Sequence, residues 1–253
     1  MFNYSKYKNL FYNLLSSELK LRYRGSFLGF LWTLIEPALI ILILLFVFSS
    51  IFKADIPLYA PYLVTGFIAW FFFANGTSLL DVFISKGNLI NKINFPIQII
   101  VFSSFFSILI LSAIQFVILE IFFISFNIIP SINLLLLPFL IALQSIFILG
   151  ILFILSSLFV FIKDLRHIWN ILLQVGFFAT PIVYPVSLLE DKAPLLLTFN
   201  PMAHFISAYR DIMVYNNFPG IGKISLLLLF ALLSFVIGFF IFKKMEIGIK
   251  EEV

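Results

Sequence analysis

The stretch LKLRYRGSFLGFLWTLIEP, residues 19–37, decides the fold of this chain. It places Arg22 and Arg24 ahead of two glycines and Trp32, and a mostly apolar run follows that ends at Phe52. Arginine favours lipid headgroups, tryptophan favours the membrane interface, and about 20 apolar residues cross the hydrocarbon core. The stretch therefore predicts a helix on the inner membrane surface that turns into a first membrane span.

The composition indicates the same class of protein. Hydrophobic residues make up 62% of the chain and charged residues 11%, and the mean hydropathy is +1.15. A soluble domain is about half apolar and about a quarter charged. With no cysteine, the 253 residues hold no disulfide, thiolate metal site or thiol nucleophile. We expect residues 1–253 to form a single membrane domain.

The first 30 residues predict an amphipathic helix rather than a cleavable signal, because no apolar block is followed by small residues. Aromatic and apolar side chains fall on one arc at helical spacing, and polar ones fall opposite. We expect this helix over residues 1–30 to lie at the membrane interface. The alternative is a helix packed on a soluble partner. The members of the apolar arc are Tyr4, Tyr7, Leu10, Phe11, Leu14 and Leu15.

Six segments have the length and apolar character that membrane spans need. The fifth is short and carries Gly176, Pro181 and Pro185, so we expect it to be broken or bent. The predicted fold class is therefore an all-α membrane protein with six transmembrane helices. The six segments are residues 31–52, 61–83, 97–126, 134–162, 168–185 and 224–242.

The orientation follows from the basic residues. Six spans place both termini on one side of the membrane, and that side holds twelve of the 16 Lys and Arg residues. The positive-inside rule then puts both termini in the cytoplasm. The net charge of +4 reflects this bias, and we expect no nucleic acid partner.

Two connections between spans carry more than a simple link requires. The inner loop at residues 85–96 is polar and is either a plain connector or a docking surface for a soluble partner, formed by Lys86, Asn88, Lys92 and Asn94. In the outer segment, Asn200 and Pro201 signal the start of an amphipathic helix. With a shorter helix over residues 194–199, it predicts re-entrant helices that either gate an opening or anchor the chain at the interface.

Some side chains inside or beside the spans suggest chemistry, and each has a plainer alternative. Glu36 and Glu120 are either functional carboxylates or groups that reach the nearby membrane surface. Trp70 and Phe71 either pack between helices or line a passage for a sugar or lipid. The sequence has no P-loop motif, so this chain does not bind ATP in that way.

At several places the sequence resembles polysaccharide-exporting ABC-2 permeases, most closely those of O-antigen exporters. Residues 19–37 resemble the first motif of that family, and residues 180–185, TPIVYP, resemble its fifth-span motif. Asn200-Pro201 followed by Arg210-Asp211 is similar to its outer gate, and the tail at residues 243–246 is also similar. The resemblance covers essentially the whole chain.

This resemblance implies a homodimer of six-span chains that binds two copies of an ABC ATPase subunit. ATP and Mg then belong to the partner, and this chain has no cofactor, metal ligand or catalytic residue of its own. The implied substrate is a polyprenyl-diphosphate-linked glycan, moved from cytoplasm to periplasm through a channel lined by spans one and five. Teichoic acid and capsule exporters share these motifs.

Site residues follow from the motifs and the resemblance together. Arg22 and Arg24 are predicted either to capture the lipid headgroup or only to anchor the chain at anionic lipids. The set for headgroup and substrate capture is Arg22, Arg24, Gly25, Gly29, Trp32 and Glu36. The channel-lining candidates are Trp70, Phe71, Phe177, Phe178 and Tyr184. The outer-gate set is Pro201, Phe205, Tyr209, Arg210 and Asp211. The docking set, with the N-terminal helix, is Lys86, Asn88, Lys92 and Asn94.

Two other classes of protein stay open at this point. A proton-coupled flippase would use Glu36 and Glu120 as proton carriers. A lipid phosphatase acting at the outer face would use His204, Arg210 and Asp211.

Overall fold

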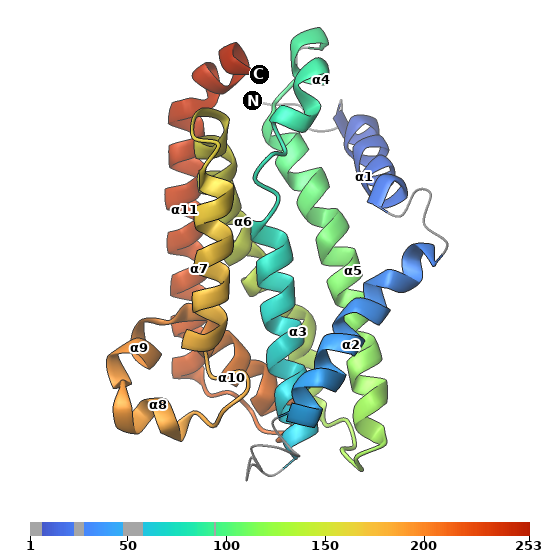
Figure 1. Cartoon of the computed structure of the whole chain (residues 1–253), viewed down its shortest axis with the longest axis vertical. Helices are drawn as coiled ribbons and strands as arrows, with labels where there is room; N and C mark the ends of the chain where they lie inside the picture. Colours follow the sequence, from blue (N-terminus) through green and yellow to red (C-terminus); the bar gives the residue numbers. More distant parts are fainter. Residues whose placement is uncertain (1–6, 23–27, 48–57, 94) are drawn as a thin grey trace.

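The computed structural model describes residues 7–22, 28–47, 58–93 and 95–253, and every regular element in them is helical. The all-α fold class is thus confirmed for the described part of the chain. In Figure 1 the long helices run roughly along one axis, with α1 and α4 at one end and α8, α9 and α10 at the other. The helices are α1 (Lys8–Arg22), α2 (Trp32–Leu45), α3 (Tyr59–Thr77), α4 (Gly87–Lys92), α5 (Gln98–Ile124), α6 (Leu137–Phe161), α7 (Leu165–Ala179), α8 (Ser187–Lys192), α9 (Pro194–Phe199), α10 (Pro201–Met213) and α11 (Ile221–Glu252).

Among the described helices, three are long and apolar enough to cross a membrane: Gln98–Ile124, Ile132–Phe161 and Ile221–Glu252. They overlap the third, fourth and sixth predicted spans. The shorter helices α2, α3 and α7 overlap the other three, and the predicted end of the first span at Phe52 lies outside the described residues. Helix α11 continues beyond the predicted span end at Phe242 and ends at Glu252. The predicted span stops at Phe242 because charged residues follow it, and these do not end the helix.

The closest helix pair in the bundle is α6 with α11, which meet through small residues. A Cβ atom on Gly238 would lie 2.0 Å from the carbonyl oxygen of Gly150. The Ser234 hydroxyl donates to the carbonyl of Phe147 at 2.8 Å. Small residues let helix backbones approach in a membrane, where dispersion contacts and interhelical hydrogen bonds replace the hydrophobic effect. This pair therefore forms the frame of the bundle.

Helix α3 is buried along almost its whole length and fills the centre of the fold. Gln144 of α6 donates to the carbonyl of Ala69 at 2.9 Å, and the Tyr209 hydroxyl of α10 donates to Gln144 at 2.8 Å. The ring of Tyr209 stacks on Phe116 of α5 at 4.9 Å between centroids. Polar and aromatic contacts thus tie α3, α5, α6 and α10 into one core.

Helix α1 packs along the end of α5 near α4. Phe11 meets Phe106 edge-on at 5.6 Å, and Leu14 is buried. Glu18 forms an ion pair of 2.9 Å with Lys86 and accepts a longer hydrogen bond from Ser104. Within the region of residues 1–30 expected to form an amphipathic helix, the structure has a helix at Lys8–Arg22, and residues 1–6 and 23–27 lie outside the described part. Part of the apolar face of α1 is covered by α5.

Candidate functional site

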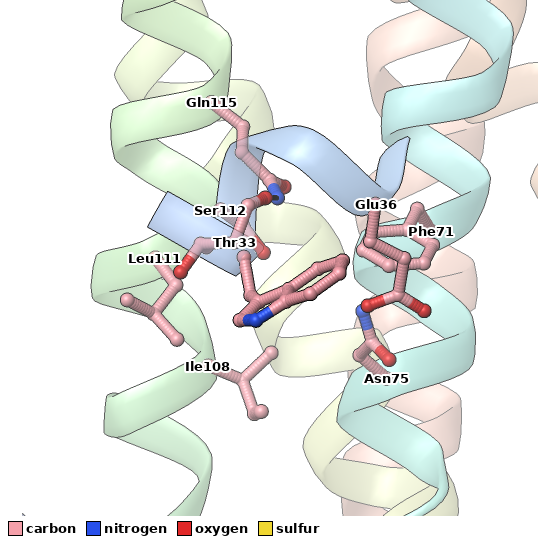
Figure 2. Close-up of a pocket in the computed structure, with 9 residues that line it drawn as sticks. Thr33, Glu36, Phe71, Asn75, Ile108, Leu111, Ser112 and Gln115 are labelled. Atoms are coloured by element: carbon pink, nitrogen blue, oxygen red, sulfur yellow. Dashed lines mark hydrogen bonds between the residues drawn. The ribbon is translucent and has the colours of Figure 1, made fainter. Parts of the chain in front are cut away.

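Helix α2 makes little contact with the rest of the bundle, since Thr33 and Pro37 are its buried residues. A pocket of about 70 Å³ lies between α2, α3 and α5. We call it the α2 pocket. In Figure 2, Glu36, Phe71 and Asn75 lie on one side, and Leu111, Ser112 and Gln115 of α5 lie on the other. Trp32 also lines this pocket.

The lining of the α2 pocket combines aromatic faces with hydrogen-bonding groups. Trp32 and Phe71 supply the rings, and Glu36, Asn75 and Ser112 supply carboxylate, amide and hydroxyl groups. Rings pack on the C–H faces of sugars, while such polar groups pair with hydroxyls. The pocket therefore brings ring faces and hydrogen-bonding groups together next to α2.

The structure brings residues from two predicted sets to this pocket. Trp32 and Glu36 come from the headgroup set and Phe71 from the channel set. Sequence reasoning missed Asn75 and Ser112, although a signal existed. Asn75 follows Phe71 by one helical turn, which places both on the same face of α3.

Three members of the headgroup set lie wholly or partly outside the described residues. Arg22 is the last residue of α1, but its side chain lies outside the described part, as do Arg24 and Gly25 entirely. Gly29 has a φ of +48°, which favours glycine because a side chain is strained there. Gly29 therefore makes the turn into α2, and no atom lies within 4 Å of the position that a Cβ would take there.

The predicted channel residues differ widely in exposure. Trp70 is buried, and its ring fills the space beside Gly176 of α7, whose Cβ would lie 2.8 Å from it. Phe177 meets Trp70 edge-on at 6.1 Å, while Phe178 is 67% exposed. Tyr184 is half-buried and donates to the carbonyl of Phe178. Within one chain, Trp70 packs between helices, and Phe178 is the open member of the set.

Helix α7 has no buried residue, although Trp169, Leu173 and Phe177 pack against the core. Near α4, Arg166 pairs with Asp81 at 3.0 Å, and the Trp169 indole donates to Thr77 at 3.1 Å. Its exposed surface carries apolar side chains and also the amide of Gln174. A helix of this kind, with apolar and amide groups both exposed, indicates a further partner or a watery passage beside it.

Beyond α7 the chain runs without helix through residues 181–185, and donors from other helices bind its carbonyls. Arg210 donates from Nη1 to Pro181 at 2.8 Å and from Nη2 to Ile182 at 3.0 Å. Tyr59 donates to Val183 at 3.1 Å. Non-helical backbone is tolerated at membrane depth only where the protein satisfies its polar groups.

Tyr62 completes this arrangement, which we call the carbonyl clamp of Tyr59, Tyr62 and Arg210. The Tyr62 hydroxyl donates to the carbonyl of Tyr184 at 2.9 Å. The Arg210 guanidinium lies 3.3 Å from the centroid of the Tyr62 ring and donates from Nε to the Tyr62 carbonyl at 3.1 Å. Gly66 has room only for a hydrogen atom here, because a Cβ would lie 2.7 Å from Arg210 Nη2.

The rest of the outer-gate set lies around the clamp. Pro201 opens α10, and Asn200 caps that helix by accepting from Met202 N at 3.0 Å. Phe205 and Tyr209 are fully buried, and Arg210 is 2% exposed. The sequence grouped Arg210 with Asp211 on an outer face. The structure instead buries it, because its partners are carbonyls from a distant segment.

The three residues proposed for a phosphatase do not converge. His204 lies 3.0 Å from the carbonyl of Thr198 and stacks on Phe230. Asp211 forms an ion pair with Lys223, and Arg210 faces the clamp carbonyls. Each side chain has a separate partner, so the geometry gives this alternative no support.

At the opposite end, α4 and the last turns of α11 form one surface. Asn88 and Lys92 are exposed, and Asn94 lies outside the described residues. A hollow of about 320 Å³ next to Lys92 also borders Lys250 of α11. Sequence reasoning missed the contribution of α11, which depends on the helix outlasting its apolar stretch.

Glu246 on α11 is held by two lysines of the same helix. Its carboxylate lies 2.7 Å from Lys243 and 3.2 Å from Lys250. Partial burial alone would raise the pKa of Glu246, but the hydrogen bonds from the two lysines outweigh it and lower the pKa. The surface near α4 therefore presents fixed charges of both signs.

The described helices define an all-helical integral membrane protein, with a polar pocket beside its first long apolar segment. The model of the ABC-2 type transporter family matches residues 9–214, and the chain belongs to that family. The family match and the similarity to named polysaccharide export permeases together confirm the resemblance stated from the sequence.

Three relatives cover nearly the whole chain. The O-antigen export system permease protein RfbA of Myxococcus xanthus is 31% identical over 238 residues, which are 89% of this chain and 90% of that protein. RfbA of Klebsiella pneumoniae is 29% identical over 91% of this chain and 90% of its own length. The polysialic acid transport protein KpsM of Escherichia coli is 23% identical over 90% of each.

Proposed function

We propose that this chain is the permease subunit of an ATP-driven exporter that moves a polyprenyl-diphosphate-linked polysaccharide from cytoplasm to periplasm. The observation that carries the proposal is the similarity to O-antigen export permeases over 89% and 91% of this chain. The lining of the α2 pocket adds a chemical reason, since its rings and polar groups are of the kinds that contact sugar faces and hydroxyl groups. The exporter lies in the inner membrane.

The proposed channel forms between two copies of this chain. In a single copy, α2 and α7 are largely exposed, and α7 presents both Phe178 and the amide of Gln174. An amide is costly against lipid tails and suits a water-filled passage. Two copies that face each other through α2 and α7 would enclose such a passage, while α10 and the carbonyl clamp would lie at its outer mouth.

Membrane orientation follows the basic residues. The surface near α4 holds Lys86, Lys92, Lys243 and Lys250, and the positive-inside rule assigns it to the cytoplasm. The chain crosses the membrane six times in this arrangement, and both termini are cytoplasmic. Each copy of the chain then binds one ATPase subunit at this surface, so that the dimer carries two. ATP and Mg bind to the ATPase subunits.

The decisive experiment is co-purification with a candidate ABC ATPase of the same organism. We expect a stable complex that hydrolyses ATP and no hydrolysis by the permease alone, because this chain lacks a P-loop. Export of the lipid-linked glycan into inverted vesicles should require ATP. Hydrolysis by the permease alone, or no stable complex, would contradict the proposal. Glycan movement driven by a pH gradient without ATP would favour a flippase.

Two docking variants sharpen this experiment. Lys92→Glu reverses an exposed charge on α4 and should weaken ATPase binding. Lys86→Glu alone also breaks the internal ion pair with Glu18, so it is tested together with Glu18→Lys, which restores that pair. Normal binding and transport in both variants would exclude α4 as the docking surface.

The headgroup proposal concerns Arg22 and Arg24. Arginine binds phosphate through a planar fork, whereas lysine offers a point charge. The double variant Arg22→Lys, Arg24→Lys should therefore insert, dimerise and bind the ATPase normally but lose most glycan export. Unchanged export in this variant would leave both residues with membrane anchoring alone, a contribution of about 1 kcal/mol per basic residue.

Capsule polysaccharide is the second candidate substrate, and teichoic acid is the third. The similarity to a polysialic acid transport protein favours the capsule alternative, although at 23% identity it is lower than the 31% to an O-antigen permease. Supplying inverted vesicles with each lipid-linked glycan in turn separates these substrates. We expect the O-antigen type to be exported.

A further inference from the structure

Pro37 removes one backbone hydrogen bond from the interior of α2. Proline has no backbone N–H, so the carbonyl of Thr33 loses the donor that an ordinary residue would supply one turn later. Gln115 of α5 provides a replacement, because its Nε2 donates to the Thr33 carbonyl at 2.8 Å. Gln115 is 5% exposed, so this hydrogen bond lies inside the protein.

The surroundings of this hydrogen bond are open on both sides. The α2 pocket of about 70 Å³ lies on one side, and an apolar groove of about 340 Å³ lies on the other. Gln115 lines both spaces. Ile41 and Leu45 of α2 and Leu119 of α5 are among the side chains that line the groove. Helix α2 is therefore joined to α5 by a hydrogen bond at Thr33, with an unfilled space on each side of that point.

We propose that Gln115 is a positioning residue, which fixes the proline-containing helix α2 to α5 and acts as the pivot of α2. The contact sets how far Trp32 and Glu36 lie from the opposite wall of the α2 pocket. Because spaces lie on both sides of the pivot, rocking of α2 would widen one as it narrows the other. The inference rests on the proposed function, in which α2 faces the substrate.

Three variants separate positioning from mere satisfaction of the Thr33 carbonyl. Gln115→Leu keeps a similar volume but removes the donor, and export should fall about fivefold. Pro37→Ala restores an N–H to α2 while Gln115 still reaches Thr33, since a carbonyl has two lone pairs. Export by this variant should stay within about twofold of the unmodified chain.

The double variant Gln115→Leu, Pro37→Ala is decisive. Its Thr33 carbonyl is satisfied within α2, so we expect normal membrane levels and thermal stability, but α2 is no longer tied to α5 and export stays low. Recovery of normal export in the double variant would overturn the proposal, as would normal export in Gln115→Leu alone. Both results would reduce Gln115 to a local hydrogen-bond donor.

A distance measurement tests the pivot without relying on export. The chain has no cysteine, so Leu39→Cys on α2 and Val117→Cys on α5, both exposed, accept spin labels selectively. Labelled chain is diluted into excess unlabelled chain, so that distances within one copy dominate. We expect a broader α2–α5 distance distribution in Gln115→Leu and in the double variant. An unchanged distribution in the variants refutes the pivot. Absence of glycan export by the unmodified chain, with a broadened distribution in the variants, refutes only the proposed substrate.

Discussion

Arg210→Lys is expected to abolish export and to lower the thermal stability of the protein. Arg210 donates to the carbonyls of Tyr62, Pro181 and Ile182 from three different nitrogens, and its plane stacks on the Tyr62 ring. Lysine keeps the charge but has one nitrogen and no plane. Losing two such charged hydrogen bonds at about 1.5 kcal/mol each costs about 3 kcal/mol. That is a large share of the about 5–15 kcal/mol that separates folded from unfolded states.

Arg166→Lys is the matched control for this experiment. The side chain of Arg166 is 44% exposed and pairs with Asp81, so the same substitution there should change little. Thermal melting in detergent and glycan export are measured for both variants. If Arg210→Lys melts and exports like Arg166→Lys, then the carbonyl clamp does not hold the end of the fifth predicted span.

The clamp also marks the limit of sequence reasoning about the candidate site. Asn200 and Pro201 correctly predicted where α10 begins, because helix caps are local signals. The burial of Arg210 was not predictable, since its partners at residues 181 and 182 come from a non-helical segment. No periodicity within α10 reports where those carbonyls lie.

A similar limit applies to Glu18. In the structure this residue of the N-terminal helix pairs with Lys86 at 2.9 Å, and no pattern within the helix reports that partner. The existence of the long helices was predictable, because hydropathy reports burial in lipid. Which helices touch was not, because the contacts between α6 and α11 depend on residues as far apart as Gly150 and Gly238.

Gly238→Ala is expected to destabilise the whole bundle, although it adds one methyl group. The added Cβ would lie 2.0 Å from the Gly150 carbonyl oxygen, 2.7 Å from its carbon and 2.9 Å from its Cα. These are backbone atoms of α6, so relief requires the two helices to separate. Overpacking of this kind costs about 1–3 kcal/mol, and more where backbone must shift.

Gly222→Ala supplies the matched control on the same helix. No atom lies within 4 Å of a Cβ built on Gly222, and alanine favours helix over glycine by about 1 kcal/mol. Thermal melting should therefore fall for Gly238→Ala and stay or rise for Gly222→Ala, and equal melting would show that the α6–α11 contact tolerates a side chain. Because α11 also carries Lys250 beside α4, separation of α6 from α11 should weaken ATPase binding as well. Gly238→Ala should therefore lower both thermal stability and ATPase binding. Loss of the Gln115 contact alone should lower export and leave ATPase binding intact.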